Sequence, residues 1–155
     1  MNGLLRINVR ISMKFNAFAF ARYGKRSGLY GIELLNEPIA SFVPLDILKS
    51  YYRRGYDIVR KYSDTYVVLC QLLGAGASDF VDLGRDFQNA ILDLHYYNLF
   101  DPTLANASVQ INIDHINTTR RNEIESLNQN GNGLLTFVGM SICGLHTSCV
   151  YVNIL

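Results

Sequence analysis

Residues Gly31–Pro38, which read GIELLNEP, combine the pattern of a buried strand with polar residues that such a strand does not need. The run is apolar on both sides of Glu33 and ends on Asn36 and Glu37, directly before a proline. Because side chains alternate along a strand, Glu33, Leu35 and Glu37 are expected to share one face. The segment therefore predicts a strand that carries a carboxylate to its carboxyl end.

Other apolar runs along the chain alternate with helical patterns. Strands are expected at residues 29–35, 65–73, 89–97 and 134–140, and helices at residues 44–62 and 114–130, with an earlier helix that stops at Gly24. Pro44 suits a first helical turn, and Asp114 or an adjacent polar residue could cap the later helix. Residues 74–86 are rich in Gly, Asp and Ser and are expected to form a loop. This order predicts an α/β fold with a parallel sheet.

Candidate functional residues stand at the points where the predicted strands end. They are Asn36 and Glu37, then His95 and Tyr97, and finally Met140 after a glycine. The carboxyl ends of parallel strands meet at one edge, so Glu37, His95 and Tyr97 are expected to line one pocket at the ends of adjacent strands. A carboxylic acid in a partly dry pocket has a raised pKa, which suits a general acid.

The residues near these strand ends can also be interpreted as purely structural. Taken alone, Glu33 and Asp93 read as buried carboxylates paired inside the sheet, and His95 as a core histidine with satisfied hydrogen bonds. Tyr96 reads as outward-facing packing and Cys70 as a core thiol. It is their joint order along the chain that favours a site.

Composition narrows the functional classes. The chain has 155 residues and a formal charge of +1, which suits one domain over residues 1–155 and provides no field for nucleic acid. No apolar run approaches the ~18 residues of a membrane span. Cys143 and Cys149 lack metal-site spacing, so no metal and no cofactor are expected.

GIELLNEP, followed in order by LDLHYYNLF at residues 92–100 and LTFVG at residues 135–139, resembles glycoside hydrolase family 5 of clan A, in particular its plant glucan 1,3-β-glucosidase-like branch. The resemblance covers about residues 29–139. It implies a (β/α)₈ barrel and retaining hydrolysis of β-glycosidic bonds by two glutamates about 5 to 5.5 Å apart. By matching motifs, Glu37 is the acid/base and Asn36 binds the sugar 2-hydroxyl. His95 and Tyr97 are the pair that contacts substrate and positions the nucleophile.

The chain departs from the family at the nucleophile, whose position is taken by Met140. A thioether cannot form the glycosyl ester, and without a second anion Glu37 is expected to titrate close to an ordinary glutamate. Residues 140–155 diverge from the family, and the chain contains no Trp.

A (β/α)₈ barrel takes about 250 residues, so the expected fold is a partial barrel of about strands 4–7 with their helices. We interpret the chain as a truncated or mis-spliced form of a β-glucan or β-glycoside hydrolase, inactive by itself. The alternatives are a non-catalytic carbohydrate-binding pseudoenzyme and an unstable fragment without sugar function. Open sheet edges would allow self-association. The sequence does not indicate a compartment.

Overall fold

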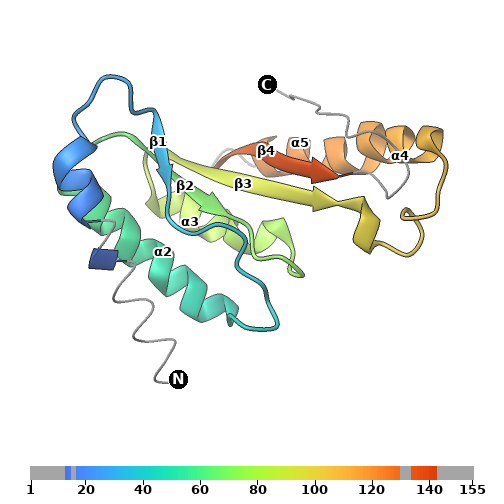
Figure 1. Cartoon of the computed structure of the whole chain (residues 1–155), viewed down its shortest axis with the longest axis horizontal. Coiled ribbons are helices and arrows are strands. Elements are labelled where there is room, and N and C mark those ends of the chain that lie inside the picture. The colour runs from blue at the N-terminus through green and yellow to red at the C-terminus, as the bar shows by residue number, and fades with distance from the viewer. Residues whose placement is uncertain (1–12, 15–16, 130–133, 143–155) are drawn as a thin grey trace.

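The computed structural model describes residues 13–14, 17–129 and 134–142. Its centre is a parallel sheet in the order β1-β2-β3-β4. The strands are β1 (Gly31–Glu33), β2 (Tyr66–Cys70), β3 (Ala90–Tyr97) and β4 (Leu135–Ile142). Figure 1 shows how their direction rotates progressively across the sheet, as the twist of strands requires. The expected parallel α/β architecture is confirmed.

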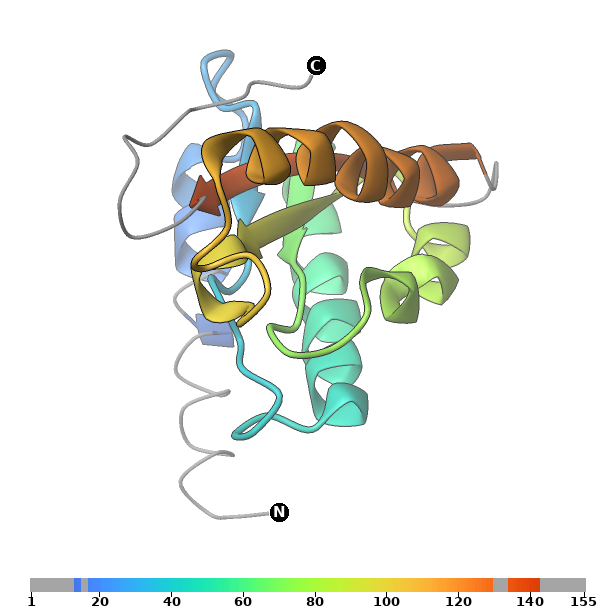
Figure 2. The same cartoon turned by 90° about the vertical axis from the view of Figure 1, so that its right-hand side faces the viewer.

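Helices connect the strands. They are α2 (Leu45–Arg60), α3 (Val81–Asp86), α4 (Val109–His115) and α5 (Arg121–Gln129), with short 3₁₀ turns η1 (Ala77–Phe80) and η2 (Asn98–Phe100) and a π-helical turn η3 (Ile116–Arg120). Residues 17–23 are also helical and end at Gly24, whose N–H donates to the Phe20 carbonyl. Figure 2 shows α4, η3 and α5 as one continuous rod beside β4. No helix of the described segments is long and apolar enough to cross a membrane.

The two faces of the sheet differ in chemistry. One face, here called the helix face, carries apolar side chains that pack into the core against α2, α3 and α5; the core includes Val67, Leu69, Leu92, Leu94, Leu48, Val59, Leu83 and Leu127. The opposite face, here called the site face, carries Glu33, Cys70, Asp93 and His95, as the strand register requires. The carboxylates, the thiol and the imidazole of the described strands are thus gathered on the side away from the helices.

Helix α2 is fixed to the sheet by hydroxyls as well as by apolar packing. Tyr51 donates to the Leu34 carbonyl at 2.7 Å, and Tyr52 donates to the Cys70 carbonyl at 2.6 Å. Both carbonyls lie where their strands end, so α2 helps to place the edge that carries Glu37. The helix begins one residue later than predicted, with Pro44 as its N-cap.

One arginine of α2 forms hydrogen bonds to main-chain carbonyls at the amino ends of the strands. Arg60, in the last turn of α2, donates to four carbonyl oxygens, those of Ser63, Thr65, Gln88 and Asn89, at 2.8 to 3.0 Å. Its guanidinium also lies over the Tyr56 ring, 4.6 Å from the centroid. A single side chain therefore joins the starts of β2 and β3 to the helix between β1 and β2.

Two predictions about local structure are wrong. The loop expected at residues 74–86 contains η1 and α3, because Phe80 and Leu83 both point into the core and their burial stabilises a short helix that composition alone does not suggest. The later helix begins at Val109 and not near Asp114. Its cap is Ser108, whose hydroxyl accepts from Ile111 N–H at 3.3 Å.

The first turns of that helix carry exposed Ile111 and Ile113, so no inward periodicity marked its start.

A β-bulge interrupts the pairing of β3 with β4. Val138 pairs with Leu94, but the next pair joins Met140 to His95, which leaves Gly139 as an extra residue. The Gly139 N–H donates to the Asp93 carboxylate at 2.8 Å. Because paired residues share a face, the bulge places Met140 on the site face.

Candidate active site

Glu37 reaches the site through a break in the β1 ladder. The chain leaves regular pairing after Glu33 and pairs again only at the isolated bridge between Ile39 and Leu73, which lies beyond the end of β2. Between these points Glu37 adopts φ +48°, a left-handed conformation that is uncommon for a side chain of this size. Its N–H, freed from the ladder, donates to the Cys70 sulfur at 3.3 Å. Strained backbone of this kind is concentrated at functional sites.

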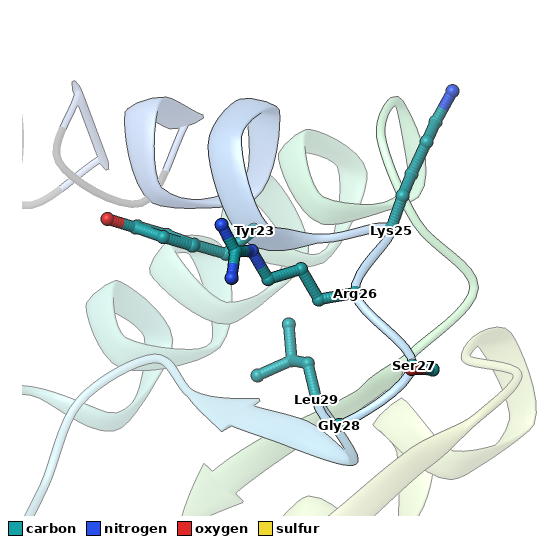
Figure 3. Close-up of a pocket in the computed structure, with 6 residues that line it drawn as sticks. All are labelled: Tyr23, Lys25, Arg26, Ser27, Gly28 and Leu29. Atoms are coloured by element: carbon teal, nitrogen blue, oxygen red, sulfur yellow. The ribbon is translucent and has the colours of Figure 1, made fainter.

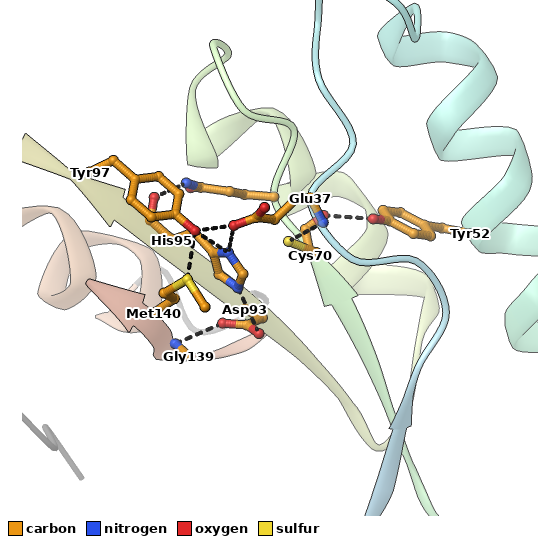
Figure 4. Close-up of polar contacts among 9 residues, drawn as sticks. Glu37, Tyr52, Cys70, Asp93, His95, Tyr97, Gly139 and Met140 are labelled. Atoms are coloured by element: carbon orange, nitrogen blue, oxygen red, sulfur yellow. Dashed lines mark hydrogen bonds and ion pairs between the residues drawn. The ribbon is translucent and has the colours of Figure 1, made fainter. Parts of the chain in front are cut away.

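The structure brings Glu37, His95 and Tyr97 together, as Figure 4 shows. His95 Nδ1 lies 2.7 Å from Glu37 Oε1, and the Tyr97 hydroxyl donates to the same oxygen. The two strands concerned are not adjacent, contrary to the prediction, because β2 lies between β1 and β3. Glu37 spans this distance because the irregular segment 34–38 extends over the end of β2.

Hydrogen bonding holds Glu37 in its anionic form. Donation from Tyr97 and then from His95 lowers the pKa of Glu37 below its ordinary value, and these effects outweigh a small opposing effect of burial. The expectation that the pKa would be raised, or would stay ordinary, is therefore wrong. Burial together with this hydrogen bond raises the pKa of Tyr97, so its hydroxyl stays protonated as the donor.

Met140 lies directly beside this cluster. Its sulfur is 2.7 Å from the Tyr97 hydroxyl, and its side chain is on the exposed side of the sheet edge. A thioether is a weak acceptor, so the tyrosine proton is directed to the Glu37 carboxylate instead. The position that the sequence assigned to a missing nucleophile is thus in contact with the predicted positioning residue.

Two further carboxylates lie deeper on the site face. Asp93 is buried, accepts from Gly139 N–H, and lies 3.3 Å from His95 Nε2. Burial raises the pKa of Asp93 and also that of Glu33. Asp93 fits the structural role that was weighed for it. Glu33 fits the paired role only in part, because a side chain of the sheet, Cys70, forms a hydrogen bond with it while its Oε1 is buried without a partner.

The other residues singled out from the sequence lie outside the Glu37, His95 and Tyr97 contacts or in the core. Asn36 is exposed to solvent and lies outside the cluster around Glu37. Tyr96 faces the helices, as expected, and donates to Glu123 at 2.9 Å under the Arg120 guanidinium. Cys70 is buried as expected, and burial raises the pKa of its thiol to about 12. Cys143 and Cys149 lie outside the described residues.

The sequence did not predict two contacts that hold the candidate site together. The Cys70 sulfur accepts the Glu37 N–H, and Gly139 supplies the N–H that holds Asp93. The only sequence signal for Gly139 was its place before position 140 in the motif. Neither contact is local in sequence, so no spacing rule would have found it.

A separate hollow of about 730 Å³ lies before the start of β1. It is lined by the last residue of the helix at 17–23 and by the loop that follows: Tyr23, Lys25, Arg26, Ser27, Gly28 and Leu29 (Figure 3). The Arg26 guanidinium lies over the Tyr23 ring, 5.4 Å from its centroid. This hollow is at the amino end of β1, whereas Glu37 follows its carboxyl end. It does not contribute to the candidate site.

Comparison with known proteins adds an independent line of evidence. No family model matches the chain. It is 30% identical over 101 residues to a glucan 1,3-beta-glucosidase of Yarrowia lipolytica, a match that covers 61% of this chain and 24% of that protein. A glucan 1,3-beta-glucosidase of Candida oleophila is 26% identical over 121 residues, covering 72% of this chain and 28% of its own length. The chain thus spans about a quarter of the curated relatives it matches.

Solved structures show the same architecture. Thermotoga maritima Cel5A, crystallised in complex with a mannotriose substrate, superposes with a TM-score of 0.68 at 15% identity, over 87% of this chain and 48% of Cel5A. A second structure, of endoglucanase Cel5A from the same organism, gives the same TM-score at 16% identity.

The chain is thus similar to a part of a glycoside hydrolase family 5 protein, in sequence to the glucan 1,3-beta-glucosidases and in fold to Cel5A. Its four parallel strands with their helices correspond to a part of the α/β barrel. Because helices form the outer ring of a (β/α)₈ barrel, the site face, which lies away from the helices, corresponds to the inner face of such a barrel.

Proposed function

We propose that this glycoside hydrolase-like chain binds a β-glucan or related β-glycoside at the carboxyl edge of its sheet and does not hydrolyse it. The observation that carries the proposal is the meeting of Glu37, His95 and Tyr97 beside Met140. The names of its relatives support the glucan as a ligand class. By the resemblance, Glu37 takes the acid/base position and Met140 that of the nucleophile.

Retaining hydrolysis needs a second carboxylate opposite the acid. Met140 cannot form a glycosyl ester, because its sulfur is already bonded to two carbons and carries no charge. Asp93 is not a substitute, since it is buried and held by Gly139 N–H and His95. In addition, the lowered pKa of Glu37 leaves little of the protonated form that a general acid requires near neutral pH.

Binding needs only polar groups and an apolar surface that accept a sugar ring. Glu37 and Tyr97 offer hydrogen-bonding groups at the edge of the sheet. Phe100 is 75% exposed, and its ring lies 5.8 Å from the Tyr97 ring in an edge-to-face arrangement. In a chain without Trp, this exposed ring can provide the stacking surface that sugars prefer. Asn36, exposed next to Glu37, remains a proposed contact for the 2-hydroxyl.

The test combines binding and turnover on the full chain. Calorimetric titration with β-1,3- and β-1,4-linked gluco-oligosaccharides should show binding, which Phe100→Ala and Glu37→Gln weaken. Phe18→Ala serves as the matched control, because Phe18 is also exposed but lies on the helix before β1. An activated aryl β-glucoside should not be hydrolysed. Turnover abolished by Glu37→Gln would contradict the proposed inactivity, and absence of binding would favour a chain without sugar function.

A further inference from the structure

Three potential metal ligands meet on the site face, below the Glu37 cluster. Glu33 of β1, Cys70 of β2 and His95 of β3 each offer a ligand atom, and these atoms lie within 4.8 Å of one another. Cys70 and His95 are buried, and Glu33 is partly buried. The three come from neighbouring strands and are far apart in sequence, so no ligand spacing predicts this set.

One atom of this cluster has no hydrogen-bond partner among the described residues. Glu33 forms a side-chain hydrogen bond with Cys70, but its Oε1 is buried without a partner, which is unfavourable for a polar group and more so for a charged one. The surrounding acidic side chains are Glu37 and Asp93, and the ion pairs described for both are with His95 alone. A single imidazole therefore faces three carboxylates, an arrangement that a bound cation would balance.

We propose that Glu33, Cys70 and His95 form a site for a divalent transition-metal ion of the zinc type. A carboxylate oxygen, a thiolate sulfur and an imidazole nitrogen are the ligands that zinc takes, usually in a tetrahedron. Hard ions such as Mg²⁺ prefer oxygen ligands alone and do not suit a thiolate. The fourth position is open to water or to Asp93, whose Oδ2 lies 3.3 Å from His95 Nε2.

The contacts of His95 are those of a prepared ligand. Its Nδ1 is 2.7 Å from the Glu37 carboxylate, so Nε2, which lies 3.3 Å from Asp93 Oδ2, is the nitrogen that would bind a metal ion. A carboxylate on the other ring nitrogen is the usual way in which proteins fix the orientation of a metal-binding imidazole. When the ion binds, the Cys70 thiol gives its proton to solvent and the sulfur forms the metal bond, so charge and atoms balance without an oxidant.

Cobalt provides the most direct test, because thiolate ligation gives a charge-transfer band in the near ultraviolet. The full chain is used with Cys143→Ser and Cys149→Ser, so that Cys70 is its single thiol. One equivalent of Co²⁺ should produce the band, and Zn²⁺ should displace it and raise the melting temperature. Cys70→Ser should abolish the band.

Glu33→Gln keeps the thiol and the shape of the side chain, and it should weaken Co²⁺ binding at least about tenfold. Asp46→Asn, at an exposed carboxylate on α2, is the matched control. The proposal is overturned if no band forms, if the band survives Cys70→Ser, or if Glu33→Gln weakens binding no more than Asp46→Asn. None of these results depends on sugar binding, so the glycan proposal is tested separately.

Discussion

Replacing Gly139 by alanine tests whether the bulge is required by the buried Asp93. An ideal Cβ built at Gly139 would lie 2.4 Å from Asp93 Oδ1 and 2.5 Å from Oδ2, far inside ordinary contact. Asp93 cannot simply move away, because it is buried and also lies against His95. The added methyl group must displace either the carboxylate or the strand.

Two costs follow from that displacement. Overpacking a well-packed position costs about 1 to 3 kcal/mol. Losing the 2.8 Å bond from Gly139 N–H to a buried carboxylate costs about 1 to 3 kcal/mol more. We expect Gly139→Ala to lower the free energy of unfolding by about 3 kcal/mol, which for a chain of this size lowers the melting temperature by roughly 6 to 12 °C.

Gly28→Ala is the matched control, because a Cβ built at Gly28 meets no atom within 4 Å. Both variants are compared with the native chain by urea unfolding and thermal melting, followed by circular dichroism. If Gly139→Ala melts within a degree or two of Gly28→Ala, the close approach of Asp93 to Gly139 is not a feature of the folded protein, and the assignment of Met140 to the site face loses its basis.

Three other predictions follow from the site and the sheet edges. First, Tyr97→Phe should raise the pKa of Glu37 toward the ordinary value of 4.5, measured by carboxyl NMR titration. The pKa of Glu37 is lower in the folded than in the unfolded chain, so its contribution to stability is present above about pH 4.5 and is lost as the pH falls through the folded value. Tyr97→Phe should make this acid-induced loss of stability smaller. An unchanged titration of Glu37 would contradict the role of Tyr97. Second, Met140→Glu should not produce hydrolysis of an aryl β-glucoside, because an exposed edge does not hold two carboxylates at the required separation. Activity that appears in this variant and disappears when Glu37→Gln is added would refute this prediction. Third, the chain should self-associate with rising concentration in light scattering, and Leu135→Lys, at a 60% exposed position on β4, should reduce this; a monomer at all concentrations would refute it.

The sequence predicted the sheet well because the signals for its strands are local. Apolar runs bounded by glycine, proline and polar residues marked all four strands and α2 to within a few residues. The same local reasoning failed for α3, whose core contacts are made by Phe80 and Leu83 within a composition typical of loops. It also failed at the start of α4, where the apolar residues face solvent.

The candidate site was predictable as a gathering of residues and not as a geometry. Strand ends and parallel topology were enough to bring Glu37, His95 and Tyr97 to one edge. The left-handed turn at Glu37 and the contact of its N–H with Cys70 depend on partners far away in sequence. The direction of the Glu37 pKa shift depends on which groups donate to its carboxylate, and only the structure shows that two donors reach one oxygen.

The ties made by Arg60 have a consequence for how such a chain can change over generations. At the amino ends of the strands, this one side chain binds four backbone carbonyls, which every amino acid supplies. At the carboxyl ends, the contacts of Glu37 with His95 and Tyr97 join side chain to side chain, so each depends on the identity of both partners. Mutations can therefore remove the chemistry of one end residue by residue, while the other end continues to hold the strands in register.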